Sequence, residues 1–243
     1  MRSIRPIAAA CSLILALAAP AGAAPTTAEE LVRRYDEIMS PGGFDSVMTM
    51  VAHREDGTTR SYKMRALKSH DDKMRVWFLE PASSRGQEML RVGDNQWVYM
   101  PNLKRAIRLA SRDSFQGGDF SNGDILRVNY RVDYTAKLVP APDDHVWALE
   151  LTARTEESTY DRIKLWIAKA NGLPVRAEYY ASSGKLLRSA TFEAVKRFHG
   201  VDGPSHITMR NELATRRFSE IVILDRKTGE IPAQKFVLDD LGR

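Results

Sequence analysis

The sequence predicts a mainly β fold, an antiparallel sheet large enough to curl or close, with few helices. Three observations predict it. Apolar residues recur with a period of two over about a dozen short segments, as they do along β-strands. Turn dipeptides such as Asp56-Gly57 and Asn171-Gly172 separate neighbouring segments, as in hairpins. No long helical pattern alternates with these segments, which disfavours a parallel sheet.

The first 23 residues have the pattern of a cleaved secretory signal peptide. Arg2 and Arg5 precede an uncharged apolar run from Ile7 to Ala18, and the small residues Ala21-Gly22-Ala23 follow it. The run is shorter than the roughly 20 residues that a membrane-spanning helix needs. We therefore expect a signal peptide over residues 1–23, export to the periplasm, and one mature domain over residues 24–243.

The cysteine content and the charge narrow the class of protein further. Cys11 is the only cysteine and lies before most of the apolar run, whereas a lipid-modified cysteine would follow that run. The mature chain would then contain no cysteine, so its fold would depend on burial without disulfides. The formal net charge of +5 could favour anionic headgroups. Export excludes cytoplasmic nucleic acid as a partner.

One helix is expected at the start of the mature chain. Thr27 is in position to cap it, and Glu30 would complete a capping box. The helix is expected to end at Ser40-Pro41-Gly42-Gly43. An apolar stripe at helical spacing predicts its buried side: Leu31, Tyr35 and Ile38.

Strands are expected to follow as an antiparallel meander. Ser46–His53 and Thr58–Lys68 flank the Asp56-Gly57 turn. An irregular stretch over Ser111 to Asn129 includes a possible short helix near Asp124 to Val128. The other predicted strands are Lys73–Glu80, Gln87–Val92, Gln96–Met100, Lys104–Leu109, Val132–Val139, His145–Ala153, Tyr160–Lys169, Leu173–Ala181, Lys185–Val195, His206–Leu213 and Arg216–Leu224.

Several predicted strands are apolar on both faces. Val76 and Phe78 alternate with Trp77 and Leu79, whereas a sheet with one face in water would alternate apolar with polar residues. The second apolar face therefore needs a cover. Either a second sheet layer packs there, or a cavity remains for an apolar guest. The methionines favour a guest, because methionine adapts to ligands of variable shape; they are Met48, Met50, Met64, Met74, Met89 and Met100.

Short motifs in the first half of the chain resemble the outer-membrane lipoprotein-sorting proteins. The resemblance is closer to their uncharacterised LolA-like relatives, in the branch that includes LolB-like and RseB-like periplasmic proteins. Phe115 to Asn122 corresponds to a Phe-x-Gly-Gly-Asp-Phe-Ser-type segment of those relatives. The similarity extends from the first helix to Lys235-Phe236-Val237-Leu238. The motifs that carry it are Arg75-Val76-Trp77-Phe78-Leu79-Glu80-Pro81, Ser84-Arg85-Gly86, Leu90-Arg91-Val92-Gly93-Asp94-Asn95 and Trp97-Val98-Tyr99-Met100-Pro101.

The resemblance implies a strongly curved antiparallel sheet that forms an incomplete β-barrel, with short helices as a lid over a hydrophobic cavity. It implies a periplasmic carrier that binds the acyl chains of a lipid or lipoprotein for transfer between the inner and outer membrane. Some relatives accompany an inner-membrane exporter, so an inner-membrane transporter, an outer-membrane acceptor and transient membrane contact are the implied partners. No cofactor is implied.

One departure from the family concerns the turn before the Trp77-Phe78 strand. The lipoprotein carrier has an arginine in that turn, which takes part in its lid chemistry. Here the turn is Ser69-His70-Asp71-Asp72-Lys73 and contains no arginine. Another lipid is therefore as compatible with the sequence as a lipoprotein.

This interpretation predicts three groups of site residues. The predicted lid contacts are Phe115 and Phe120, which could instead simply anchor a long loop. The candidates for headgroup or partner contact are Arg85, Arg91, Arg105 and Arg108, whose alternative role is a solvated strand face. The predicted cavity liners are Met48, Met50, Met64, Phe78, Trp97 and Tyr99. A carrier also predicts an interior with more apolar wall than its own side chains fill.

The sequence does not suggest an enzyme. The five histidines are scattered without the His-Glu-x-x-His spacing of a zinc site, and no nucleophile elbow or phosphate-binding loop occurs. Asp119 to Asp124 lacks the spacing of an EF-hand. Two other functions stay open: a periplasmic sensor that regulates a protein partner when lipid is bound, and a structural envelope subunit with a filled core. Lipid uptake distinguishes the sensor from the structural subunit. Delivery of the bound lipid to membranes distinguishes a carrier from a sensor.

Overall fold

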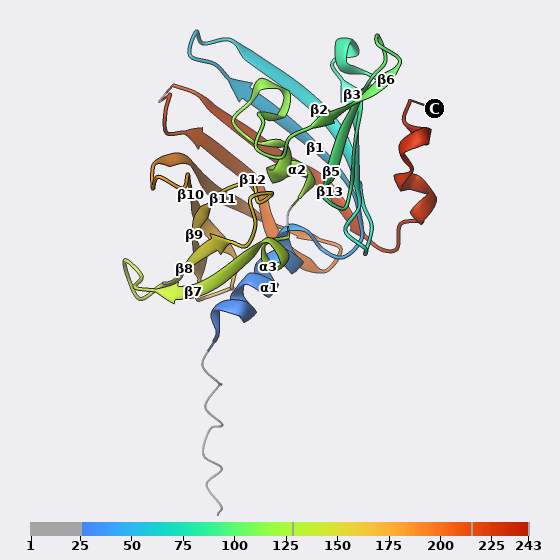
Figure 1. The fold of residues 1–243 in the computed structure, drawn as a ribbon. Coiled ribbons are helices and arrows are strands. Elements are labelled where there is room, and N and C mark those ends of the chain that lie inside the picture. The colour runs from blue at the N-terminus through green and yellow to red at the C-terminus, as the bar shows by residue number, and fades with distance from the viewer. Residues whose placement is uncertain (1–25, 128, 215, 243) are drawn as a thin grey trace, which may run out of the picture.

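One antiparallel sheet contains all the strands of the described residues, which are 26–127, 129–214 and 216–242 of this computed structural model (Figure 1). The predicted signal peptide lies outside the described residues. The strands are β1 (Phe44–His53), β2 (Thr59–Lys68), β3 (Met74–Glu80), β4 (Glu88–Val92), β5 (Asn95–Met100), β6 (Arg105–Leu109), β7 (Tyr134–Val139), β8 (Val146–Ala153), β9 (Arg162–Ala168), β10 (Pro174–Tyr180), β11 (Leu186–Phe198), β12 (Val201–Asn211) and β13 (Phe218–Thr228).

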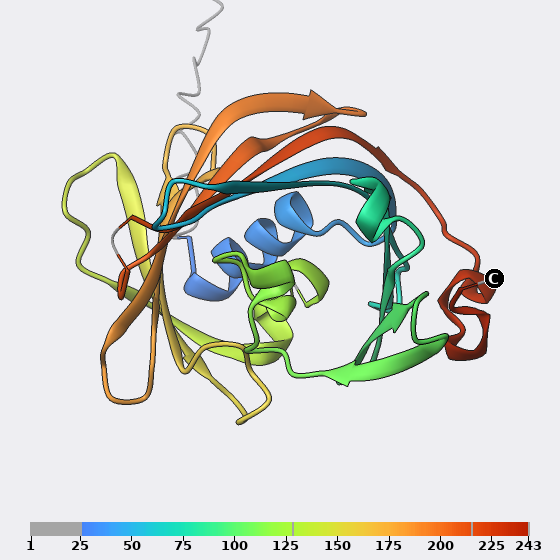
Figure 2. The same ribbon diagram turned by 90° about the horizontal axis from the view of Figure 1, so that it is seen from above.

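The strand order explains how the sheet forms an incomplete barrel. It runs β6-β5-β4-β3-β2-β1-β13-β12-β11-β10-β9-β8-β7, so β1 pairs with β13 in the middle and the two edges are consecutive strands. The sheet curls strongly, but β6 and β7 do not pair with each other, and the barrel stays open between them (Figure 2). The predicted fold class is confirmed.

Short helices lie on the inner, concave side of the sheet. They are α1 (Ala28–Met39), α2 (Asn122–Leu126) and α3 (Tyr130–Asp133), and Figure 2 shows α1 and α2 inside the curl. Four 3-10 turns complete the description: η1 (Ala82–Ser84), η2 (Phe115–Gly117), η3 (Ala233–Phe236) and η4 (Leu238–Asp240).

Helix α1 begins where the sequence predicts. The Thr27 side chain accepts a hydrogen bond from the Glu30 amide at 3.2 Å and so satisfies one of the free amides of the first turn. The predicted apolar stripe is buried, and Tyr35 stacks on Tyr130 of α3 with ring centroids 4.8 Å apart. The Asp36 carboxylate accepts hydrogen bonds from the Tyr130 and Arg131 amides, both at 2.9 Å. These contacts join α1 to α3 inside the sheet.

The two faces of the sheet carry separate hydrophobic clusters, which settles how the second apolar face is covered. The inner cluster extends from α1 through the concave face to α2 and α3. The outer cluster is small and consists of Leu67, Leu90, Phe236 and Leu241, with Trp77, Trp97 and Tyr99 beside it. The C-terminal segment with η3 and η4 therefore covers the outer face of β3 to β5, and no second sheet layer does so within the described residues.

A buried ion pair holds this C-terminal segment in place. Arg75 and Glu88 pair on the outer face, and each side chain is only 6% exposed. Arg75 also donates hydrogen bonds to the carbonyl oxygens of Lys235 at 3.1 Å and Asp240 at 2.9 Å. Because these bonds use donors that the ion pair leaves free, the guanidinium ties the segment to the sheet.

The largest deviation from the predicted strands lies in β11 and β12. Both strands are longer than predicted and meet at a tight turn, His199-Gly200, with φ values of 44° and 94°. The predicted strands end at Val195 and begin again at His206, whereas β12 already includes Gly203-Pro204. Proline is tolerated there because β12 pairs with β13 only from His206 to Arg210. The predicted start of β7 at Val132 is also wrong, since α3 occupies those residues.

Candidate functional site

The candidate site is the inner face of the sheet and the segment that covers its opening. This segment, residues 110–133, connects the two edge strands and includes η2, α2 and α3; we call it the lid segment. Near its start it reaches the other half of the sheet, where the Ser111 hydroxyl lies 3.1 Å from the hydroxyl of Thr159, in the loop between β8 and β9. The gap between β6 and β7 is thus bridged by the chain that joins them.

Large apolar side chains of the lid segment fill the interior. Phe115 and Phe120 are buried in the inner cluster, together with Ile125 and Leu126 of α2. The Phe115 ring stacks on Phe78 of β3 with centroids 5.9 Å apart. The structure therefore places both predicted lid phenylalanines against the sheet, a position that fits a lid contact and a loop anchor equally.

A buried hydrogen-bond network fixes α2. Ser121 caps this helix, and its amide and hydroxyl both donate to the Asp124 carboxylate, at 2.7 and 2.8 Å. The Tyr160 hydroxyl donates to the same carboxylate at 2.7 Å and accepts from Arg188 at 2.8 Å. Burial raises the pKa of Asp124, whereas Arg188 and the donors from Ser121 and Tyr160 favour its charged form.

A second polar contact fixes the loop before α2. Asp119 is buried, and its carboxylate accepts hydrogen bonds from the Ser219 hydroxyl at 2.9 Å and the Asn211 side chain at 3.2 Å. Arg217 lies 3.4 Å away as its ion-pair partner. The lid segment is thus attached to β12 and β13 at Asp119 and to the region before β9 at Asp124.

The interior is largely filled. One cavity of about 50 Å³ lies between α1, the lid segment and the tyrosines Tyr130, Tyr160 and Tyr179. Another, of about 70 Å³, lies between Phe44, Met48, Ile221, Ile223 and Arg226. Both are far below the roughly 300–1,000 Å³ of pockets that hold small molecules. The expectation of an unfilled interior is therefore not met, because the lid side chains occupy the space.

The structure brings four of the six predicted cavity liners together. Met48, Met50, Met64 and Phe78 are buried side by side in the inner cluster. They project from β1, β2 and β3 toward the lid segment. Their role as ligand contacts stays a prediction.

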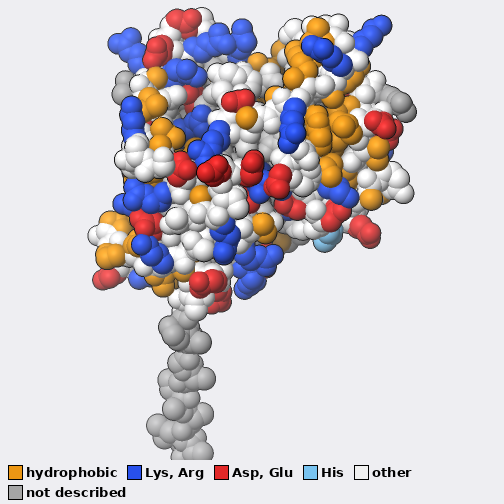
Figure 3. Space-filling view, viewed as in Figure 1, with side chains coloured by type: hydrophobic (Ala, Val, Ile, Leu, Met, Phe, Trp, Pro, Cys, Tyr) orange, Lys and Arg blue, Asp and Glu red, His pale blue; other side chains and the backbone are white. Residues whose placement is uncertain are grey.

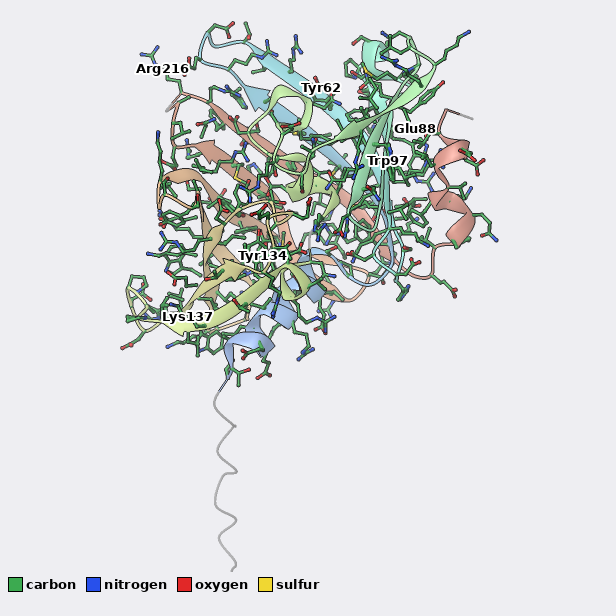
Figure 4. The ribbon with its side chains drawn as sticks, viewed as in Figure 1. Tyr62, Glu88, Trp97, Tyr134, Lys137 and Arg216 are labelled. Carbon is green, nitrogen blue, oxygen red and sulfur yellow. The ribbon has the colours of Figure 1, made fainter. Side chains whose placement is uncertain are left out.

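Trp97 and Tyr99 differ from the prediction, because they lie on the outer face beside the C-terminal segment. Figure 4 shows Trp97 and Glu88 on this side of the molecule. The side chain between them, Val98, is the one that packs on the inner cluster. Period-two alternation was correctly predicted here, but the face was assigned with an error of one residue.

The four predicted headgroup arginines do not form one group. Arg91 is buried: it pairs with Asp72 at 3.0 Å and donates to the Leu126 carbonyl at 3.2 Å. The structure therefore contradicts an exposed headgroup contact at Arg91, whose partners are internal. Arg85, Arg105 and Arg108 are exposed. Figure 3 shows that basic and acidic side chains are interspersed on the visible face, with several basic ones at its upper edge.

Sequence reasoning missed the polar residues that hold the lid segment. Asp119, Asp124, Tyr160 and Arg188 come from separate parts of the chain, and their association depends on the curl of the sheet. One signal was present, since Ser121-x-x-Asp124 before Ile125-Leu126 is a helix-capping pattern.

Two searches over the described part of the chain bear on the class of site. No three histidine, cysteine, aspartate or glutamate side chains in residues 26–127, 129–214 and 216–242 are placed to bind a metal ion. No helix in the same ranges is both long and apolar enough to span a bilayer.

Comparisons with known proteins agree with the fold. A family model described as "Uncharacterized protein" matches residues 70–243. A LolA superfamily protein from Nitrosomonas europaea is 30% identical, with a TM-score of 0.80, and the match covers 88% of this chain and 99% of that one. A DUF1329 family protein from Desulfovibrio piger is 21% identical, with a TM-score of 0.79 over 88% of this chain and 97% of that one.

A third solved structure is described as an outer membrane lipoprotein-sorting protein domain, from Vibrio parahaemolyticus. It is 23% identical, with a TM-score of 0.74 over 89% of this chain and 98% of that one. At this identity, as for the Desulfovibrio protein, the likeness shows the fold alone. No curated protein matches the sequence.

Proposed function

The chain belongs to the LolA superfamily, and from this premise we propose that it is a periplasmic carrier for the acyl chains of a lipid or lipoprotein. In this proposal the guest lies in the interior of the curled sheet and moves between the inner and outer membrane. Residues 1–23 are removed on export, and residues 24–243 form the carrier domain. The protein binds its guest and performs no chemical step on it.

One observation carries the proposal: a single connecting segment supplies much of what fills the apolar interior. The wall comes from the sheet and includes Met48, Met50, Met64 and Phe78. The filling comes from α1 and from the lid segment, the latter through Phe115, Phe120, Ile125 and Leu126. Displacement of the lid segment from α1 and from the sheet would therefore uncover apolar surface of the wall without breaking any strand pairing.

The energetics of exchange favour this arrangement. Each methylene kept from water contributes about 0.8 kcal/mol, so a chain of roughly 15 methylenes represents on the order of 12 kcal/mol. A rigid empty cavity would retain such a guest too tightly for delivery. Here the guest would replace lid side chains that are already buried, so the free energies of the empty and loaded states offset each other. Loading and release then both become accessible.

The contacts of the lid segment are suited to reversible displacement. At Asp119 and Asp124 it is attached by hydrogen bonds and an ion pair, each of modest net free energy. The methionines of the wall adapt to the shape of the incoming chain, because their side chains are unbranched and flexible. Inner-membrane exporters and outer-membrane acceptors are the proposed donors and recipients, reached by transient membrane contact.

Native mass spectrometry of protein released gently from the periplasm tests the proposal. We expect a bound species with the mass of a lipid or acylated peptide, and uptake of lipid from detergent micelles after delipidation. Absence of a bound species in repeated preparations, together with no uptake from micelles, would contradict it. Transfer of the bound lipid to acceptor vesicles distinguishes a carrier from a sensor, which would retain lipid and change its affinity for a protein.

A further inference from the structure

Arg226 of β13 is a buried cation with no carboxylate partner among the described residues. It is only 8% exposed. Its Nη1 donates a hydrogen bond of 3.0 Å to the Ile38 carbonyl at the end of α1. The guanidinium carbon lies 5.2 Å from the ring centroid of Phe44 and 5.7 Å from that of Phe198. Its Nε is buried without any hydrogen bond in the described structure.

The other buried cation at this end of α1 has a carboxylate partner as well as carbonyl acceptors. Lys68 donates to the Ser40 carbonyl at 3.1 Å and the Pro41 carbonyl at 3.3 Å, and its Nζ lies 3.4 Å from the Asp72 carboxylate. Arg226 has one carbonyl and two aromatic rings but no carboxylate among the described residues, and burial lowers its pKa to about 10. Burial of an unpaired charge is costly. The missing anionic partner therefore points to one that comes from outside the chain.

A cavity lies beside this guanidinium. It measures about 70 Å³, and its wall includes Phe44, Met48, Ile221 and Ile223. This volume exceeds what one water molecule needs and admits a small oxyanion, but it does not hold an acyl chain. Asp124 and Ile125 of α2 also line it. Displacement of the lid segment would therefore extend the cavity into the interior and carry the Asp124 carboxylate away from the anion site.

The free edge of the guanidinium has the geometry of an anion receptor. Within the described residues, the side-chain hydrogen bond of Arg226 uses Nη1, which leaves the Nε and Nη2 donors on one edge. Two parallel N–H groups on that edge match the two oxygens of a carboxylate or phosphate. The rings of Phe44 and Phe198 stabilise the cation and restrict its orientation.

We propose that the guest is an anionic amphiphile, whose carboxylate or phosphate pairs with the free edge of Arg226 while its hydrocarbon chain lies along the inner wall. The inference rests on the proposed carrier function and adds the chemical class of the guest. It also gives the guest a direction, with the headgroup at the α1 end of the barrel. A neutral amphiphile of equal length would leave Arg226 unpaired and bind more weakly.

Three ligands with the same chain test the inference: dodecanoate, dodecyl phosphate and dodecanol, each added to delipidated protein below its micelle concentration. Displacement of a fluorescent acyl probe gives the affinities. At least one anion should bind about tenfold or more tightly than dodecanol, since hydrogen bonds between charged groups are strong. The preferred anion tells a fatty acid from a phosphate headgroup, and either preference supports the inference.

Arg226→Met should reduce the preference for the anion to within about twofold and leave the affinity for dodecanol unchanged. The matched control is Arg210→Met, because Arg210 is exposed on the neighbouring strand and lies over the Phe218 ring at 5.4 Å. Arg226→Lys retains the charge without the two-donor edge and should show an intermediate preference. This variant and the wild-type comparison suffice if Arg226→Met does not fold.

The outcomes separate the two proposals. Equal binding of all three ligands by the wild-type protein would leave the carrier function standing and overturn the role of Arg226. An anion preference that survives in both Arg226 variants would also overturn the role of Arg226 and leave the carrier function standing. Failure of the wild-type protein to bind any of the three ligands would overturn the carrier function itself.

Discussion

The hydroxyl of Tyr160 donates a 2.7 Å hydrogen bond to the carboxylate of Asp124, across the opening of the curled sheet. Tyr160 precedes β9, whereas Asp124 belongs to the first turn of α2. This contact therefore joins the lid segment to the part of the sheet that it must leave when the interior opens. Arg188 supports it through a 2.8 Å hydrogen bond to the same hydroxyl.

Tyr160→Phe should loosen the lid segment without disturbing the sheet. The Asp124 carboxylate would lose one buried donor, which costs about 1–3 kcal/mol. Hydrogen exchange of the α2 amides should accelerate accordingly, while amides in β1 and β2 keep their protection. Tyr180→Phe is the control, since Tyr180 pairs with Glu178 outside the lid network. Unchanged exchange in α2 would show that this contact does not hold the lid segment.

A disulfide between residues 52 and 118 should lock the lid segment. A Cβ placed on Gly118 would lie 3.5 Å from the Cβ of Ala52, within the range that disulfides span, and 3.0 Å from the Ser219 hydroxyl, which must shift slightly. Ala52→Cys with Gly118→Cys should, when oxidised, take up an acyl probe at least about tenfold more slowly than the wild type, because closure blocks loading.

Reduction of the same double variant should restore uptake, which controls for any effect of the substitutions themselves. The single variant Ala52→Cys should behave like the wild type. The only cysteine of the sequence, Cys11, lies in the predicted signal peptide, so the mature double variant has no competing thiol. Equal uptake rates for the oxidised and reduced forms would exclude the lid segment as the gate.

Arg75→Met should destabilise the protein strongly. It would leave Glu88 buried and unpaired, and breaking a buried pair in this way costs about 3–5 kcal/mol. The C-terminal segment would also lose two of its hydrogen bonds. Urea unfolding measures the loss. Arg65→Met is the matched control, because Arg65 is half exposed beside Asp45 and such pairs contribute about 0–1 kcal/mol. Equal losses for the two variants would contradict the prediction.

The stability of the protein should depend on pH through Asp36. Burial raises the pKa of Asp36 from 3.8 to about 6, against the opposing hydrogen bonds from the amides of Arg131 and Tyr130. The folded state therefore favours the neutral carboxyl. This contribution is complete below pH 3.8 and is lost as the pH rises through about 6.

Asp36→Asn removes this titration and keeps one of the two oxygen acceptors that the amides of Tyr130 and Arg131 use. Relative to the wild type, the variant should therefore gain stability between pH 4.5 and pH 7.5, two values on either side of the raised pKa. Urea unfolding of both proteins at the two pH values measures the difference. If the two proteins differ by the same free energy of unfolding at both pH values, Asp36 does not titrate in this range.

The local elements were predictable because their signals are local. The Asp56-Gly57 turn, with Gly57 at a φ of 81°, and the Thr27 cap of α1 were both predicted and are both present. The face of β5 was not predictable, because Trp97 and Tyr99 are as apolar as their neighbour. Only the packing of the C-terminal segment distinguishes the outer face from the inner one.

The association of distant residues was not predictable either. Arg226 follows an ordinary strand pattern, and nothing near it in the sequence indicates that Phe44, Phe198 and the end of α1 enclose it. Arg91 was assigned to the surface by its charge, although Asp72 and the Leu126 carbonyl compensate it inside. In both cases the curl of one sheet produces the environment, and a single sequence does not specify that curl residue by residue.

The central pairing of β1 with β13 has a consequence for how the chain folds. Every other ladder of the sheet joins strands that are consecutive in sequence, whereas this one aligns Phe44 with Thr228. Closing so long a loop costs conformational entropy. The chain incurs this cost before the ladder contributes any stabilisation. Two meanders, β1 to β6 and β7 to β13, can each assemble early from local hairpins. We therefore expect their union along this one ladder to limit the folding rate.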